Sequence, residues 1–197
     1  ISSPSGGGKT TVVRRLRRRM PRLVRSVSVT TRPPRPGERR GREYVFVSPA
    51  EFRRLRRIGR LLEWARVHEA YYGTPRRPIE RALRRGRDVL LSIDVQGARK
   101  IRRQLGRRAV LIFLLPPSRV RLRERLRHRR TDSPEAIRRR IAAAKRELAC
   151  AAWYEHRVVN DRLDATVERV RAIIGKTRGN QRGSRTNQWR RRRSKSS

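Results

Sequence analysis

The sequence predicts an α/β protein built on a doubly wound parallel sheet. Two stretches, "DVLLSIDV" (88–95) and "AVLIFLLP" (109–116), are short and almost continuously apolar, which is typical of strands buried on both faces. A helical pattern follows each of them, "QGARKIRRQL" after the first and "SRVRLRERLRHR" after the second. Strands that alternate with helices in this way favour a parallel sheet with helices on both faces.

The region between the first helix and residue 88 follows a different pattern. "REYVFVS" and "LLEWARVHEA" alternate like half-exposed strands. "SPAEFRRLRR" begins with a capping box and a proline at the first helical position, which predicts a helix. This region is therefore expected to be a small mixed α/β insert carried on the main sheet.

Three further elements complete the predicted fold. "DSPEAIRRRIAAAKRELACAAWYEH" (132–156) predicts a long helix, and one apolar stripe joins Ile137, Ile141, Ala144 and Leu148. "RVVN" (157–160) predicts a third buried strand, and "DATVERVRAIIG" a last helix with Asp164 as its N-cap. Residues 176–197 have no apolar periodicity, nine basic side chains and no acid, which predicts a disordered basic tail.

Composition bounds the functional classes. The 56 Lys and Arg against 16 Asp and Glu give a net charge of +40, a field that attracts nucleic acid or anionic lipid. An arginine bias of the genome would give the same excess without a function, and the sequence leaves both accounts open. A single cysteine excludes an internal disulfide, and three scattered histidines show no metal-ligand spacing. No apolar run reaches the roughly 20 residues of a membrane span, so we expect a cytoplasmic protein.

The segment "SSPSGGGKTTVVRRL" near the start of the chain predicts a phosphate-binding loop. Gly8, Lys9 and Thr10 match the end of the pattern G-x-x-x-x-G-K-[ST], although Ser3 stands at its first glycine. Glycines let backbone N–H groups wrap a phosphate, the lysine adds a charge, and the Thr10 hydroxyl can hold Mg²⁺. The sequence thus predicts a P-loop nucleotide site.

Five motifs together resemble the guanylate kinase family: the loop, "SVSVTTRPPRPGE", "YVFV", "LLEWARVHEAYYGTP" and "LLSIDVQGA". They occur in the family's order and spacing, and the resemblance extends to about Gly175. It implies a P-loop kinase that transfers the γ-phosphate of ATP to GMP, and also to dGMP, with Mg²⁺. It also implies a core of residues 1–31 and 88–175, a GMP-binding insert of residues 32–87, and a helical lid at about 125–140.

The resemblance assigns the acceptor site to the insert. It implies that Arg32, Arg35, Tyr44 and Tyr72 hold the GMP phosphate. It also implies that the guanine is read by Ser28, Glu63, Thr74 and Asp94, and that Gly73 belongs to the GMP site. The residues support these roles independently. Three prolines stiffen the segment around Arg32 and Arg35, and guanidinium forks suit a phosphate. A carboxylate accepts from both N1–H and the 2-amino group of guanine, whereas adenine presents a bare acceptor there.

The donor site is assigned to the loop and the lid. ATP binding is implied for Ser5, Gly6, Gly7, Gly8, Lys9, Thr10, Thr11 and Asn160, with Thr10 as the metal ligand. Catalytic roles are implied for Lys9, Arg32, Arg129 and Arg140, with Arg125 as a weaker lid candidate. Phosphoryl transfer needs alignment and positive charge on the transferred group, which these cations would supply.

Three departures from the family pattern bear on activity. Ser92 stands where the family usually has the first acid of "DID", which puts the surroundings of Mg²⁺ in doubt. His128 and Arg130 occupy lid positions where the family usually has glycine. Only Ile1 precedes the loop as an apolar residue, so a truncated first strand is expected.

Two alternatives stay open beside an active kinase. One is a guanylate-kinase-like binding module with weakened catalysis; the other is a P-loop fold with additional nonspecific nucleic-acid binding through its basic surface and tail. The sequence does not indicate an oligomeric state.

Overall fold

The computed structural model describes residues 1–67, 69–127 and 134–193. Its core is a parallel sheet in which β1 (Val24–Arg25) pairs with β6 (Val89–Leu90), and β7 (Ile112–Leu115) pairs with β8 (His156–Val159). Residues 1–3 lie between the two pairs. The Ile1 nitrogen donates to Leu91 O at 2.8 Å, and Ser2 N donates to Ile112 O at 2.9 Å. The few residues ahead of the loop thus act as the central strand, in the order β1, β6, residues 1–3, β7, β8.

Helices cover both faces of this sheet, as predicted. Alternate residues of the β7 region face opposite sides: Ile112 and Leu114 pack in one cluster, and Leu111 and Phe113 in another. The first cluster includes residues of α1 (Lys9–Arg19) and α7 (Leu163–Arg193), and the second includes residues of α4 (Val95–Leu105). Short 3₁₀ helices at Gly106–Arg108 and Cys150–Trp153 lead into β7 and β8.

The insert has its own four-stranded sheet, in the order β3 (Tyr44–Phe46), β2 (Ser28–Thr30), β5 (Ala70–Pro75), β4 (Leu61–Val67). Two helices, α2 (Pro49–Arg57) and α3 (Arg76–Arg84), accompany it. The predicted cap is confirmed, because Ser48 Oγ accepts from Glu51 N at 3.1 Å. Strand β2 pairs with β3 and β5, so the insert's sheet begins at Ser28, before the boundary expected from the sequence.

The lid predicted at about 125–140 falls on the end of α5 (Arg119–Arg127), the start of α6 (Pro134–Ala149) and residues 128–133, which lie outside the described part of the chain; we call α5 and α6 the lid region. Ile141, Ala144 and Leu148 of the predicted stripe pack with Leu122 and Leu126 of α5. The helix predicted for residues 132–156 is shorter in the structure, since α6 ends at Ala149 and β8 begins at His156. Within the described part of the chain, no helix combines the length and the apolar character needed to cross a membrane.

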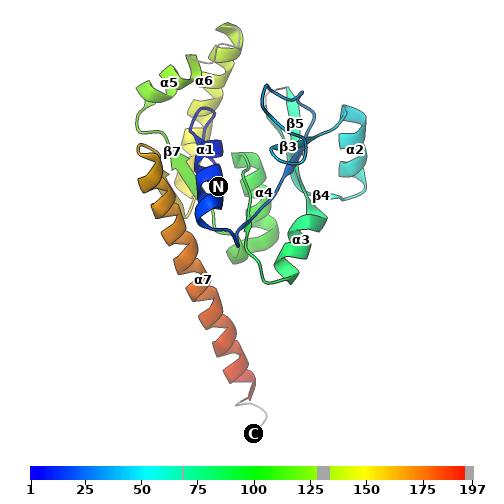
Figure 1. Ribbon diagram of the computed structural model, residues 1–197, viewed down its shortest axis with the longest axis vertical. Helices are drawn as coiled ribbons and strands as arrows, with labels where there is room; N and C mark the ends of the chain where they lie inside the picture. The colour runs from blue at the N-terminus through cyan, green and yellow to red at the C-terminus, as the bar shows by residue number, and fades with distance from the viewer. Residues whose placement is uncertain (68, 128–133, 194–197) are drawn as a thin grey trace.

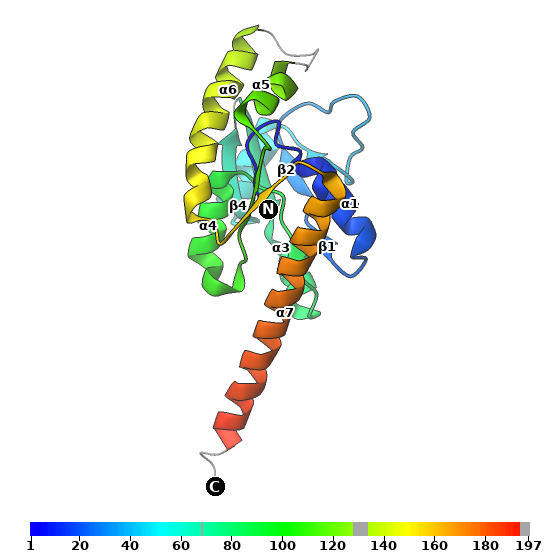
Figure 2. The same ribbon diagram turned by 90° about the vertical axis from the view of Figure 1, so that its left-hand side faces the viewer.

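Two predictions about the C-terminal region are corrected. Asp164 is not the N-cap; it lies in the first turn of α7 and pairs with Arg15 and Arg19 of α1. Residues 176–193 are not irregular, because α7 continues to Arg193, and its C-terminal part extends away from the other elements in both side views (Figures 1 and 2). No proline interrupts this segment, and Arg178 pairs with Asp88 at its start.

Candidate functional site

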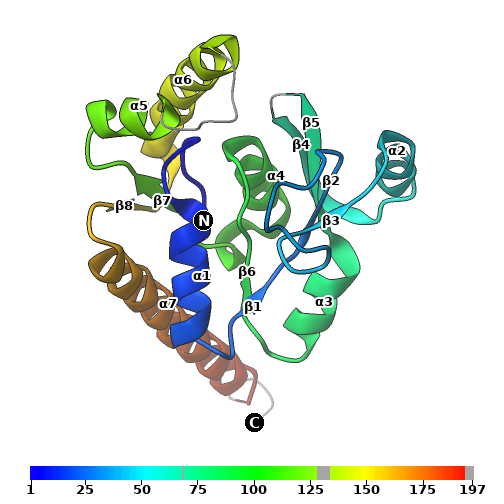
Figure 3. The ribbon, with the colours of Figure 1, turned by 45° about the horizontal axis from the view of Figure 1, so that its top comes forward.

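A cavity of about 390 Å³ lies where the phosphate loop, the insert and the lid region meet. Figure 3 shows the N-terminal loop ahead of α1 between the insert on one side and α5 and α6 on the other. All three regions contribute lining side chains, among them Lys9 from the loop, Glu63 from β4 and Arg140 from α6. The sequence predicted these three contributions, and the tertiary structure brings them to one place.

The glycines of the loop are required by its geometry. Gly6 and Gly8 have φ of 78° and 82°, a left-handed conformation that glycine adopts without strain. A Cβ on Gly7 would lie 2.9 Å from Pro4 O. Asn160 directly follows β8, and its Nδ2 donates to Gly7 O at 2.8 Å. This hydrogen bond fixes the backbone of the loop to the end of that strand. Asn160, to which the resemblance assigned ATP binding, is buried and lies directly against the loop.

The loop opens directly into α1, whose first residue is Lys9. Lys9, Thr10 and Thr11 all line the cavity, so the partly positive N-terminus of the helix faces the cavity and is suited to bind an anion. Lys9 Nζ donates to Ile93 O at 2.8 Å. Burial lowers the pKa of Lys9, while the carboxylates of Asp94, Glu147 and Glu63 oppose that shift. A phosphate in the cavity would give this buried ammonium a counter-charge.

Helix α6 contacts the loop through two side chains. Glu147 Oε2 accepts from Ser5 N at 3.0 Å, and Arg140 Nη1 lies 3.5 Å from Ser5 Oγ. Burial raises the pKa of Glu147, and the hydrogen bond from Ser5 N works against that shift. The loop is thus attached to the helix that follows the lid segment, by residues more than 130 positions apart.

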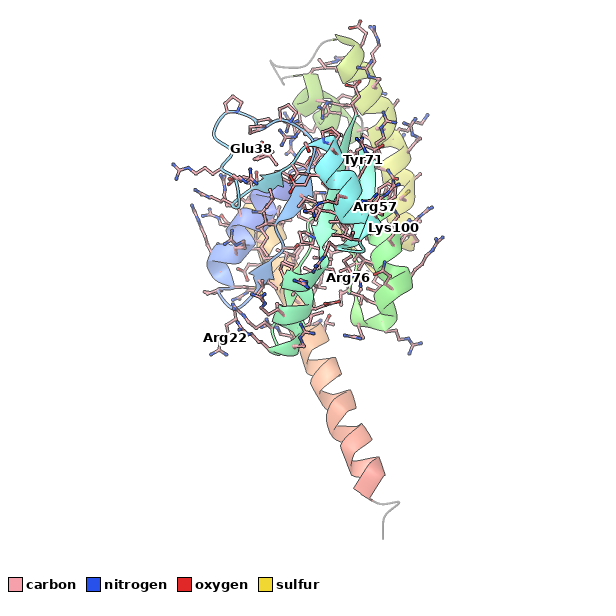
Figure 4. All side chains as sticks on the ribbon, turned by 90° about the vertical axis from the view of Figure 1, so that its right-hand side faces the viewer. Arg22, Glu38, Arg57, Tyr71, Arg76 and Lys100 are labelled. Atoms are coloured by element: carbon pink, nitrogen blue, oxygen red, sulfur yellow. The ribbon has the colours of Figure 1, made fainter. Side chains whose placement is uncertain are left out.

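Residues 32–38, which follow β2 and are here called the arginine segment, are held by the carboxylate of Glu38. Arg32 Nη2 donates to both oxygens of Glu38, at 2.9 and 2.8 Å, and Arg35 N donates to Glu38 Oε2 at 2.8 Å. The Arg32 guanidinium also lies 5.5 Å from the ring centre of Tyr44. Figure 4 labels Glu38 on this loop. Arg35, Tyr44 and Tyr72 line the cavity, whereas Arg32 lies beside it in contact with Tyr44.

A buried carboxylate occupies the insert's side of the cavity. Glu63 is 4% exposed, and the hydroxyl of Thr74 donates to its Oε1 at 2.5 Å. Burial raises the pKa of Glu63 to about 7, an effect that the Thr74 hydrogen bond opposes. Asp94 caps α4 by accepting from Gly97 N at 2.9 Å. A Cβ on Gly97 would lie 2.5 Å from Glu63 Oε2, so this glycine makes room for the carboxylate.

The structure brings most of the predicted site residues together. The cavity lining includes Ser5, Gly6, Gly7, Gly8, Lys9, Thr10, Thr11, Ser28, Arg35, Tyr44, Glu63, Tyr72, Asp94, Arg125 and Arg140. Thr74 reaches the site through Glu63. Gly73 does not line the cavity, and a Cβ there would meet Leu61 and Phe52 in the insert's core. Arg129, with the lid positions His128 and Arg130, lies outside the described residues.

Three residues of the site were not singled out by sequence reasoning. Glu38 is the last residue of the motif "TTRPPRPGE", and Gly97 lies in the motif "LLSIDVQGA". Their positions within these motifs could have identified both as site residues. Glu147 carried no comparable signal, because it is one acid in a long helix and its partner Ser5 is far away in sequence.

Comparisons with known proteins agree with this geometry. The guanylate kinase family model matches residues 1–177. A guanylate kinase of Gloeobacter violaceus is 51% identical over 174 residues, covering 88% of this chain and 84% of the relative. One of a Wolbachia of Brugia malayi is 47% identical, covering 90% and 91%. The crystal structure of guanylate kinase from Anaplasma phagocytophilum has a TM-score of 0.75 at 35% identity, covering 89% of this chain and 82% of that one. The phosphate loop, the arginine segment and the buried Glu63 thus occur in the fold that the sequence predicted. This chain belongs to the guanylate kinase family.

Proposed function

We propose that the protein transfers the γ-phosphate of MgATP to GMP, and also to dGMP, in the cavity described above, giving ADP and GDP. One observation carries this proposal. A phosphate loop and the buried carboxylate of Glu63 line the same cavity, which the exposed Arg35 also lines. A donor phosphate chain and an acceptor phosphate can therefore meet there, as direct transfer requires.

On the donor side, the loop binds the ATP phosphates. Backbone N–H groups around Gly6, Gly7 and Gly8 and the N-terminus of α1 face the anion, and Lys9 supplies a mobile charge. The donor set suits Mg²⁺ rather than a metal held by protein alone. Among the described residues no three His, Cys, Asp or Glu side chains form a metal site, whereas the Thr10 hydroxyl lines the cavity. Mg²⁺ commonly combines one such oxygen with phosphates and waters, and when bound it would neutralise phosphate charge.

On the acceptor side, Glu63 selects guanine and the arginine segment holds the phosphate. Ionised Glu63 accepts from N1–H and the 2-amino group, while Thr74 fixes its orientation. Arg35, Tyr44 and Tyr72 provide donors for the GMP phosphate. Arg32, fixed by Glu38, adds positive charge beside Tyr44. Asp94 and Ser28 complete the guanine side of the cavity.

For the transfer itself, an oxygen of the GMP phosphate attacks the γ-phosphorus, and the bond to the β,γ-bridging oxygen of ATP breaks. Lys9, Arg140 and Arg125 line the cavity where charge spreads over the transferred group, and Arg129 is the further lid candidate. Ser92 also lines the cavity in place of a second acid. Because Lys9 and the acceptor residues are all present, we expect an active enzyme of cytoplasmic purine nucleotide metabolism.

The experiment is a coupled steady-state assay of ADP formation from MgATP with GMP, dGMP, AMP, CMP and UMP in turn. GMP is expected to give the highest kcat/KM, and chelation of Mg²⁺ is expected to abolish turnover. A Lys9→Ala variant should lose about 10²-fold or more in turnover, because charge stabilisation on the transferred phosphate is lost. Equal use of AMP and GMP, or turnover of Lys9→Ala within a few-fold of the parent, would refute the proposal.

A further inference from the structure

A second cavity, of about 660 Å³, lies at the opposite end of α1 from the phosphate loop and shares no lining residue with the first. We call it the arginine cavity, because six of its lining residues are Arg14, Arg17, Arg18, Arg25, Arg42 and Arg87. Helix α1 has 11 residues and is therefore about 16 Å long, so the two cavities are separate sites. Figure 3 shows α1 running from the loop to the turn that leads into β1.

The two faces of α1 differ in how their charge is balanced. Arg15 and Arg19, on the face toward α7, pair with Asp164, and Arg19 also pairs with Glu168. On the other face, Arg14 and Arg18 have no carboxylate partner among the described residues, and the same holds for Arg17 and Arg87. No acid lines the arginine cavity, and the pair that Arg42 makes with Glu43 is mostly exposed on the arginine's side.

The guanidinium of Arg25 is fixed in the wall of this cavity. Its Nη1 donates to Arg42 O at 2.7 Å, and its Nη2 donates to Glu43 O at 3.1 Å. Its Nε is buried and has no hydrogen-bond partner in the described part of the chain. Two backbone carbonyls orient this group, and among the described residues no carboxylate forms an ion pair with it, although Glu43 acts on it at longer range. A largely uncompensated positive charge therefore stays in a partly buried position. An anion in the cavity would offset both this charge and the repulsion among its neighbours.

We propose that the arginine cavity is a second ligand site, which binds an anion made of two or more linked phosphates. Guanidinium groups bind phosphate oxygens through paired N–H donors, and several separated guanidiniums match several phosphates. The other lining residues are Pro21, Leu23 and Val24. They offer no aromatic ring for stacking and no carboxylate for reading a base, so the phosphate chain itself is what the cavity recognises. Closely spaced phosphates occur in free oligophosphates, where bridging oxygens link them, and in the backbone of nucleic acid, where sugars link them.

The test is isothermal titration calorimetry of the intact protein with inorganic tripolyphosphate. The parent is expected to bind two equivalents, one at the phosphate loop and one in the arginine cavity. The variant Arg14→Gln/Arg18→Gln removes two unpaired guanidiniums spaced one turn apart and is expected to lose the second equivalent or bind it at least about tenfold more weakly. The same titration is repeated with a single-stranded octanucleotide. The ligand that binds the arginine cavity more tightly shows whether the cavity prefers a free oligophosphate or a nucleic-acid backbone.

The matched control is Arg53→Gln/Arg57→Gln, which removes the same charge at the same spacing from the exposed face of α2. Figure 4 shows Arg57 on α2, well apart from Arg22, which follows the cavity residue Pro21. The control should keep both equivalents, and both variants should retain kcat for GMP phosphorylation within about twofold, which verifies folding. The proposal is overturned if the parent binds only one equivalent of tripolyphosphate. It is also overturned if both variants bind both ligands equally more weakly, because binding then depends on the overall positive charge and not on this cavity.

Discussion

At the scale of single residues, the protonation of Glu63 provides a pH test of the proposed acceptor site. Burial raises its pKa to about 7, so the free folded protein carries a neutral Glu63 below that pH. Guanine offers two donors and needs the ionised form, so we expect kcat/KM for GMP to rise with pH up to about 7. Below that pH it should fall about tenfold per pH unit. A pH series of steady-state kinetics with GMP measures this.

Glu63→Gln separates this ionisation from the titration of the GMP phosphate, which both proteins share. The variant places an amide donor opposite the donors of guanine, so kcat/KM for GMP should fall by about tenfold or more. The component of the pH profile due to Glu63 should disappear. An identical pH profile in the parent and the variant would exclude Glu63 as the titrating group.

Gly97 gives a second prediction for a single residue. Alanine in the interior of a helix is normally more stable than glycine by roughly 0.5–1 kcal/mol. At Gly97 the new Cβ would lie 2.5 Å from Glu63 Oε2 and would displace that carboxylate. Gly97→Ala should therefore raise KM for GMP about tenfold or more while KM for ATP stays within about twofold.

Gly175→Ala is the control for Gly97→Ala, because Gly175 lies in α7 with nothing within 4 Å of its added Cβ. That variant should have unchanged kinetics and equal or slightly higher thermal stability. If Gly97→Ala leaves KM for GMP unchanged, the close packing of Gly97 against Glu63 does not position the acceptor site.

At the scale of elements, α6 holds the phosphate loop through Glu147. Removing the acceptor with Glu147→Ala leaves Ser5 N without its partner, so we expect KM for ATP to rise about tenfold, the cost of a lost hydrogen bond to a charged group. Glu147→Gln keeps a carbonyl oxygen for Ser5 N and should restore KM to within about threefold. Steady-state kinetics with ATP as the varied substrate checks both variants.

Glu135→Ala serves as the control on the same helix, since Glu135 is exposed and its ion-pair partner within the described residues is Arg138, which is also exposed. It should leave both KM values unchanged, because exposed ion pairs contribute little. Equal kinetics for the Ala variant, the Gln variant and the parent would mean that α6 does not position the loop.

At the scale of the whole molecule, deletion of the C-terminal half of α7 tests whether polyanion binding depends on a part of the chain that the enzymatic activity does not need. Ile173 and Ile174 pack on the core and Arg178 pairs with Asp88, so the helix is anchored as far as residue 178. Deleting residues 180–197 removes seven basic side chains and no acid. GMP phosphorylation should stay within about twofold, while log K for a DNA duplex should depend less steeply on log salt.

A second deletion, of residues 173–197, is the matched test of the anchor. It removes the two isoleucines from the core cluster and should lower the melting temperature and the turnover, because buried aliphatic surface is lost. If the shorter deletion alone abolishes turnover, the terminal part of α7 belongs to the folded kinase. If the salt dependence stays the same after that deletion, the core carries the nucleic-acid affinity.

Local patterns determined much of this molecule. The loop around Lys9, the cap at Ser48 and the apolar strand at Ile112–Leu115 were all predicted correctly, because each depends on contacts or periodicities within a few residues. The arginine segment and Glu63 were assigned to the site by the family resemblance, and their roles stay predictions. The local patterns misjudged the end of α7, since charge without apolar periodicity does not by itself stop a helix.

The tertiary structure decided what joins these pieces. Residues 1–3 become the central strand only because Leu91 and Ile112 supply carbonyl partners on either side. Glu147 reaches Ser5 across 142 positions, and Gly97 makes room for Glu63 across 34. The sequence by itself determines which residue types are available and which local elements they form. Packing of the whole chain decides which distant groups meet, because the pairing of buried polar atoms depends on how the helices and sheets close around them.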